Sequence, residues 1–253
     1  MNLLKYRLAQ LVSSAQRAKP EYDLHRRVLM YHSINQSSNS ASDSSSDTYS
    51  ISEWNFAAHV DLLAEHCDSL NSKIVSLDSA SKSGVTITFD DGYRDTLTVA
   101  AKILDAKKLP FTVFVTSQNV TSGDSTYLSQ SQLIELSKIP GVTIGSHGHS
   151  HTHLAELSSL EVHNELRHSK EWLEQTIQKT VTTLSYPHGS FNAEVVRLAA
   201  DTGYKFAATS KWGVYQVGTR PLEIPRIDVW GPDTKRTLQQ KLCGKWNWMA
   251  GFI

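Results

Sequence analysis

Short β-rich runs alternate with longer segments of helical periodicity along most of this chain. The strand-like runs cover residues 28–34, 85–89, 111–115, 142–146, 182–186, 206–209 and 224–229. The helical patterns cover residues 53–66, 94–107, 130–138, 158–178, 192–202 and 234–242. Strands that alternate with helices in this way indicate parallel strands joined by crossover helices. A length of 253 residues suits one α/β barrel, so we predict a single domain.

Three segments fall outside this alternation. Residues 1–26 place leucines at helical spacing among lysines and arginines, which predicts a basic amphipathic helix or extension. Residues 35–50 are rich in serine and nearly free of apolar residues, so they are a solvated linker or a flap beside a site. Residues 246–253 form an aromatic tail that we expect to pack on the barrel, with membrane contact as the alternative. The barrel itself is predicted to span residues 27–245.

Composition narrows the class of protein. The formal net charge is zero, which argues against a nucleic-acid partner. Cys67 and Cys243 stand alone, without a CxxC pattern. No segment has the quality of a signal peptide or the length of a membrane span, so we expect a cytoplasmic protein, with the inner face of the membrane as a further location. The sequence does not indicate an oligomeric state.

Two adjacent carboxylates, Asp90 and Asp91, end the strand-like run 85–89 and precede Gly92. Neighbouring side chains at a strand end diverge, so one carboxylate can bind a cation while the other accepts a proton. The same residues could serve only as helix caps, because aspartate accepts hydrogen bonds from the first N–H groups of a helix.

A histidine cluster follows the strand-like run 142–146. His147, His149, His151 and His153 are four of the eleven histidines in the chain. Neutral imidazole is a common ligand for zinc and related ions. His147 and His151 are four residues apart, so one helical turn would bring their rings together, whereas a looser loop could use His149 or His153. A solvated polar loop is the alternative without a metal.

Together these motifs resemble the NodB-homology polysaccharide deacetylases, carbohydrate esterase family 4. The residues Thr88–Gly92 and Ser146–His151 are similar to the first two motifs of the family, and Leu184–Asn192 is similar to the third. The resemblance extends from about Arg27 to about Val229. It implies a deformed barrel of the (β/α)7 type.

The resemblance also implies a role for each motif residue. Asp91, His147 and His151 would hold one divalent metal ion. The ligand types favour zinc, with cobalt, nickel or manganese as alternatives. Asp90 would be the general base that deprotonates a metal-activated water. The substrate would contact the segment formed by Tyr186, Pro187, His188 and Gly189. The backbone amide near His188 would help to hold the oxyanion.

The general acid of the common family is a histidine near the C-terminus, and no histidine follows His188 here. The segment Val28–Ile34 instead resembles the Tyr-His motif that opens circularly permuted members, among them the biofilm poly-N-acetylglucosamine deacetylases. A strand moved from the end of a closed barrel to its start occupies the same place. The resemblance therefore implies that His32 is the general acid, and a core histidine is the alternative.

Two positions depart from the common family pattern. Ser185 stands where an arginine is thought to orient the base. Arg226 could take over that task by pointing its guanidinium at Asp90, or it could pair with Glu223 or Asp228 at the surface. His188 stands where the family often has tyrosine, which would alter the wall of the pocket and leave a backbone amide unaffected.

These features predict a metal-dependent enzyme that removes an N-acetyl group from an amino sugar of a glycan or a lipid-linked oligosaccharide. One alternative is a catalytically silent carbohydrate-binding relative, although a binder needs neither Asp90 nor His32. Another is a deformylase or small-amide hydrolase on the same scaffold.

Overall fold

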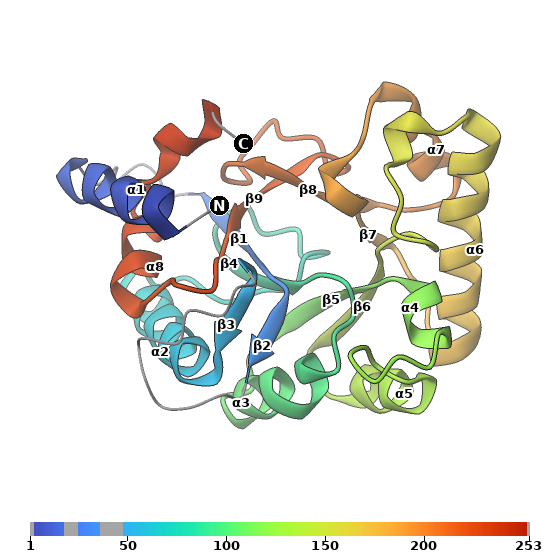
Figure 1. Cartoon of the computed structure of the whole chain (residues 1–253), viewed down its shortest axis with the longest axis horizontal. Helices are drawn as coiled ribbons and strands as arrows, with labels where there is room; N and C mark the ends of the chain where they lie inside the picture. The colour runs from blue at the N-terminus through green and yellow to red at the C-terminus, as the bar shows by residue number, and fades with distance from the viewer. Residues whose placement is uncertain (1–2, 18–24, 36–47, 252–253) are drawn as a thin grey trace.

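Seven parallel strands close into a barrel at the centre of the protein (Figure 1). The computed structural model describes residues 3–17, 25–35 and 48–251. In barrel order the strands are β1 (Arg26–Tyr31), β4 (Gly84–Phe89), β5 (Phe111–Val115), β6 (Val142–Ser146), β7 (Thr183–Ser185), β8 (Phe206–Trp212) and β9 (Ile224–Asp228). The pairing of Leu29 with Ile227 joins β1 to β9 and closes the barrel. The predicted single-domain α/β barrel is confirmed.

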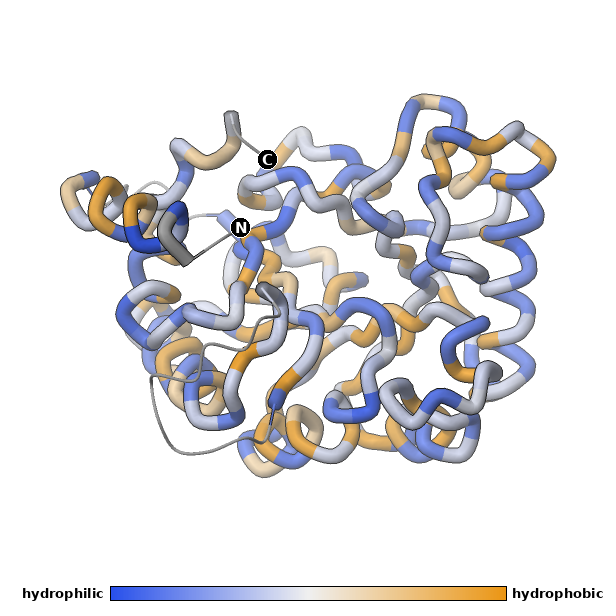
Figure 2. Tube along the Cα trace, viewed as in Figure 1, coloured by the Kyte–Doolittle hydropathy of each residue, from blue (hydrophilic) through white to orange (hydrophobic). Residues whose placement is uncertain are grey.

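Helices surround the barrel (Figure 2), and most of them contribute buried apolar side chains to its core, whereas α1 leaves Leu8 and Leu11 exposed. They are α1 (Leu3–Ala15), α2 (Glu53–Ser69), α3 (Ala101–Ala106), α4 (Ser117–Thr121), α5 (Gln130–Lys138), α6 (Ser159–Ile177), α7 (Ala193–Asp201) and α8 (Lys235–Leu242). The longest, α6, begins at a capping box in which Ser158 and Glu161 satisfy each other's backbone N–H groups. Its side chains at helical spacing, Val162, Leu166 and Leu173, are buried.

The structure differs from the sequence prediction in several places: β8 continues to Trp212, and α4 was not predicted. The expected strand 28–34 is broken at His32: β1 ends at Tyr31, and β2 (Ser33–Asn35) leaves the barrel to pair with β3 (Ser50–Ser52). The expected helix 94–107 begins with a π-helical turn, Thr96–Ala100, before α3. Residues 36–47 of the serine-rich segment lie outside the described residues, so its role stays a prediction.

The two ends of the described chain pack together on α8. Trp246 has no exposed surface, and its ring lies beside those of Tyr6 and Trp230. Cys67 is buried, Cys243 is half-buried, and the two are not joined by a disulfide bond. Among the described helices, none combines the length and the apolar character needed to span a bilayer.

Candidate active site

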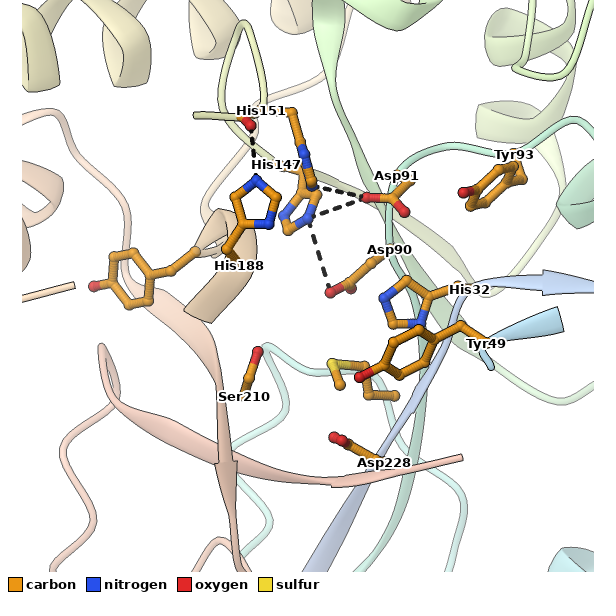
Figure 3. A pocket seen from close by; sticks show the side chains of 12 residues that line it. His32, Tyr49, Asp90, Asp91, Tyr93, His147, His151, His188, Ser210 and Asp228 are labelled. Atoms are coloured by element: carbon orange, nitrogen blue, oxygen red, sulfur yellow. Dashed lines mark hydrogen bonds and ion pairs between the residues drawn. The ribbon is translucent and has the colours of Figure 1, made fainter. Parts of the chain in front are cut away.

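A pocket of about 420 Å³ opens at the carboxyl ends of the barrel strands (Figure 3). In a parallel barrel these ends meet on one face, where residues from different strands converge. The pocket is lined by Met30, His32, Tyr49, Asp90, Asp91, Tyr93, His147, His151, Tyr186, His188, Ser210 and Asp228. Every chemical motif of the sequence analysis therefore contributes to one pocket.

Three side chains in this pocket form a candidate metal site. Oδ1 of Asp91 lies 3.3 Å from Nε2 of His147 and 3.1 Å from Nε2 of His151. One ligand atom from each residue can be chosen so that all three lie within 4.8 Å of one another. Oδ1 of Asp91 is buried and accepts no hydrogen bond of good geometry from any described residue. Two imidazole nitrogens and an unsatisfied carboxylate oxygen fit a divalent cation.

The protonation of His147 also suits a ligand. Its Nδ1 lies 2.8 Å from the carbonyl oxygen of Ser185, which can only accept, so Nδ1 carries the hydrogen and Nε2 faces Asp91. Burial lowers the pKa of His147, but the negative charges of Asp90 and Asp91 outweigh that effect and raise the pKa. The same local excess of negative charge favours a bound cation.

The loop after β6 holds His151 in place at a conformational cost. Asp91 and His151 both have positive φ angles, 72° and 57°, in a region that residues other than glycine rarely occupy. Glu165 on α6 fixes the loop, since its carboxylate accepts hydrogen bonds from the backbone N–H groups of His149 and Ser150 at 3.0 and 2.9 Å. Glu165 was not predicted as a site residue, because its position in a helix carries no local signal of this contact.

The two remaining histidines of the cluster point elsewhere. Nδ1 of His149 lies 2.9 Å from the hydroxyl oxygen of Ser117, and its ring lies near that of His168. The ring of His153 stacks on that of His188, with 4.1 Å between centroids. The structure therefore brings His147 and His151 together with Asp91 and leaves His149 and His153 outside this group.

Asp90 is held by a buried network inside the barrel. Arg226 is fully buried and donates two hydrogen bonds to Asp90, each 2.7 Å long, in a bidentate pair. The hydroxyl of Ser185 donates to Oδ2 of Asp90 at 3.1 Å. The structure thus places Arg226 on Asp90, while Glu223 pairs with Arg220.

The charge of Asp90 follows from this network. Burial by itself would raise the pKa of the Asp90 carboxyl, but Arg226, with His147 and His32, outweighs burial and lowers the pKa. Asp90 is therefore a carboxylate at neutral pH. Its Oδ2 lies 4.0 Å from Nε2 of His147, so this oxygen is the one nearer the candidate metal site.

His32 lies on the pocket wall at the break between β1 and β2. Figure 3 shows its ring beside Asp90, and the ring centroid lies 4.4 Å from that of Tyr49. Its Nδ1 is buried and makes no hydrogen bond to the described residues. Burial lowers the pKa of His32, although the charges of Asp90 and Asp91 act in the opposite direction. A core position facing away from the pocket is not observed.

The segment after β7 forms another wall of the pocket. His188 has a φ of 55°, and its Nε2 lies 3.1 Å from the carbonyl oxygen of His151, so Nε2–H donates there. The hydroxyl of Tyr186 donates to the carbonyl oxygen of Leu222. Gly189 passes so close to Ser210 that an added Cβ would lie 2.8 Å from its hydroxyl. The side chain of His188 therefore supports the loop that carries His151.

Asp228, the last residue of β9, is a pocket residue that the sequence analysis considered only as a surface partner of Arg226. It is 3% exposed, and its Oδ1 makes no hydrogen bond to the described residues. Burial raises its pKa to about 6. Residues two apart on a strand share a face, so the burial of Arg226 carries Asp228 inward as well. This alternation of side chains along the strand was the sequence signal from which the inward position of Asp228 could have been predicted.

We expect Asp228→Asn to stabilise the protein at neutral pH. The pKa of Asp228 rises from 3.8 to about 6 on folding. Between these pH values, the folded state keeps a proton on Asp228 that the unfolded state has already released. The stability of the wild type therefore falls as pH rises from about 4 to 6, and above 6 the variant should be more stable by about 2–3 kcal/mol. Urea denaturation at pH 4 and pH 7.5 measures the difference, which should be small at pH 4. A variant less stable than the wild type at pH 7.5 would contradict this assignment.

The chain belongs to the polysaccharide deacetylase family. The family model for polysaccharide deacetylases matches residues 78–207, which carry the acidic pair, the histidine cluster and the segment after β7. The resemblance inferred from the motifs is confirmed.

Individual relatives agree with this assignment. The YxkH protein of Bacillus subtilis is 30% identical over 192 residues, a match covering 74% of this chain and 64% of YxkH, so the chain spans less than two thirds of that protein. The Streptococcus pyogenes deacetylase PplD in complex with acetate superposes with a TM-score of 0.72 at 22% identity, covering 87% of this chain and 99% of PplD. IcaB from Ammonifex degensii gives a TM-score of 0.71 at 20% identity over 87% of this chain and 97% of IcaB. At these identities the two structures establish a shared fold.

Proposed function

We propose that this protein removes the N-acetyl group from an amino sugar of a glycan by metal-dependent hydrolysis. One observation carries the proposal: Asp91, His147 and His151 converge within 4.8 Å, beside a carboxylate, Asp90, that is held separately. A hydrolytic site needs a cation and an independent base close together, and here two consecutive residues divide those tasks.

Asp91, His147 and His151 would hold the metal ion. Their oxygen and nitrogen atoms suit zinc, and the same ligands can hold cobalt, nickel or manganese. When bound, such an ion acts as a Lewis acid toward the acetamido carbonyl and acidifies water. Three protein ligands leave further coordination positions for water and substrate.

Asp90 acts as the general base. Oδ2 accepts the proton of the attacking water, and the bidentate contact with Arg226 holds the carboxylate plane in one orientation. The hydroxyl of Ser185 adds a third contact. Arg226 thus does from β9 what the arginine of the common family is thought to do from the position of Ser185.

His32 acts as the general acid. The amide C–N bond breaks with the electron pair on nitrogen, so the amine leaves only if that nitrogen is protonated, and His32 supplies this proton. Burial lowers the pKa of His32, and the negative charges of Asp90 and Asp91 only partly offset this lowering, so the free site holds mainly the neutral imidazole, which takes up its proton in the course of the reaction. The products are acetate and a free amino sugar.

The wall formed by Tyr186, Pro187, His188 and Gly189 receives the acetyl end of the substrate. We place the tetrahedral oxyanion against the backbone amide near His188. A pocket of about 420 Å³ has room for a single sugar ring with its acetamido group, so the rest of a polymer or a lipid-linked oligosaccharide extends outside it.

Hydrolysis of defined oligosaccharides tests this function. The metal-loaded chain is incubated with N-acetylglucosamine oligomers, their N-formyl analogues and a simple non-sugar acetamide, and free amine and released carboxylate are measured. We expect acetate from the acetylated oligomers and much slower reaction of the acetamide. Formate as the dominant product would identify a deformylase, and binding of the oligomers without any product would favour a silent carbohydrate-binding protein.

Metal analysis tests the ligand set. We expect one divalent ion per chain in the wild type, and at least a tenfold weaker affinity in His147→Ala and in His151→Ala, because each loses a ligand atom. His149→Ala is the matched control, since the ring of His149 contacts Ser117 and His168 and should leave the metal content unchanged. Full metal content in both ligand variants, with loss in the His149 or His153 variant, would reassign the site.

A further inference from the structure

Helix α1 leaves its larger aliphatic side chains on the side away from the protein. Its inner side buries Tyr6, Ala9 and Ser13 against α8 and the loop after β9. There the hydroxyl of Tyr6 donates to Asp233 at 2.9 Å, and the amide of Gln10 donates to Thr237 at 3.1 Å. On the outer side, Leu8 is 63% and Leu11 71% exposed. A helix that packs only on its own domain would bury such apolar side chains and expose its polar face.

The spacing of these residues makes the outer side a continuous stripe. Positions 8, 11 and 12 follow the i, i+3, i+4 rule, so Leu8, Leu11 and Val12 share one face. The exposed basic residues Lys5 and Arg7 lie on either side of this stripe. An apolar stripe flanked by cations is the pattern of a helix that lies in the interface of a membrane.

The surrounding surface is basic although the whole chain is neutral. Residues 3–17 contain three lysines and arginines, residues 235–251 contain four, and neither segment has an acidic residue. These two segments pack together as α1, α8 and the C-terminal turn (Figure 1). Part of the charge is already compensated, since Lys241 is buried on Asp233 and Lys235 pairs with Glu65.

We propose that α1 is a docking helix that binds the surface of an anionic lipid bilayer through Leu8, Leu11 and Val12. The basic residues of α1 would lie at the level of the negatively charged headgroups. A second copy of the chain fits this face less well, because a twofold contact through α1 would bring the same acid-free basic segments against each other.

The position of α1 relates this surface to the pocket. The ring of Tyr6 lies 6.2 Å from that of Trp230, two residues after the pocket residue Asp228. α1 therefore borders the end of β9 at the open face of the barrel. If the proposed function holds, a glycan attached to a lipid would be presented beside the pocket, whereas binding to the bilayer does not depend on catalysis.

Vesicle flotation of the full chain tests the docking helix without any assay of activity. The vesicles contain phosphatidylcholine alone or with about one third phosphatidylglycerol. We expect the wild type to float with the anionic vesicles and to be released by high salt. The double variant Leu8→Gln/Leu11→Gln should bind the vesicles more weakly by at least about tenfold. The double variant Lys5→Gln/Arg7→Gln should lose the preference for anionic lipid.

Val217→Gln is the matched control. Val217 is 84% exposed and lies in the β8–β9 connection, near Tyr215, which pairs with Arg26 at the amino end of the barrel. This variant should bind as the wild type does, and circular dichroism should be unchanged in all variants. Equal binding by the wild type and the leucine double variant would overturn the proposal. So would a dimer in solution, measured by light scattering, that the double variant dissociates.

Discussion

Asp90→Asn and Asp91→Asn should fail in different ways, although the two residues are adjacent. We expect Asp90→Asn to keep its metal and to lose turnover by about a hundred- to ten-thousand-fold, because an amide cannot accept the proton of the attacking water. Asp91→Asn should bind the metal ion itself more weakly, because it replaces a charged ligand with a neutral one. Metal content and kcat are measured on the same preparations.

Activity in the presence of excess metal distinguishes the general base from the metal ligand. Adding metal in excess should restore part of the activity of Asp91→Asn and none of that of Asp90→Asn. Asp105→Asn serves as a control, since the carboxylate of Asp105 pairs with the exposed Lys108 and does not line the pocket. If excess metal rescues Asp90→Asn instead, the two carboxylates have the opposite roles.

His32→Ala should keep both metal and substrate binding while the hydrolysis of the amide falls by about a hundredfold or more. The loss should depend on the leaving group. An ester such as 4-nitrophenyl acetate releases a stable anion without a proton, so on this substrate His32→Ala should be much closer to the wild type. Asp90→Asn should be slow on both substrates, because water must lose its proton in either reaction.

His168→Ala provides the matched histidine control, because His168 is exposed on α6 and does not line the pocket. It should hydrolyse both substrates as the wild type does. An equal loss by His32→Ala on the amide and on the ester would argue against an acid role. It would leave His32 as a support of the pocket wall.

The alternation of strands and helices was readable from local pattern because each barrel strand is a short β-rich run between helical segments. The pattern failed at His32, where one apolar run continues past the point at which the chain leaves the barrel. Backbone pairing decides that point: Tyr31 pairs with Phe89 in the barrel, whereas Ser33 pairs with Ser50 outside it. Hydrophobicity does not distinguish the two environments.

The types of residue in the candidate site could be predicted from the sequence, but which of the histidines take part could not. Four histidines close together indicate a ligand loop, but the choice of His147 and His151 depends on a positive φ at His151 and on the contact of Glu165 with the loop. The contact of Arg226 with Asp90 joins strands that are far apart in sequence. No local pattern specifies such a contact, so the surface pairing was an equally good interpretation.

The sequence by itself determined that carboxylates and histidines follow the barrel strands, since this depends only on residue order and strand period. The tertiary structure decided which of them meet. Closure of the barrel places β1 between β4 and β9, so His32 and Arg226 reach Asp90 from opposite ends of the chain. The orientation of α1 was likewise decided by its docking partner, because its hydrophobic pattern fits either an inward or an outward apolar face. Contacts between distant residues depend on strand order and packing, which local periodicity does not contain.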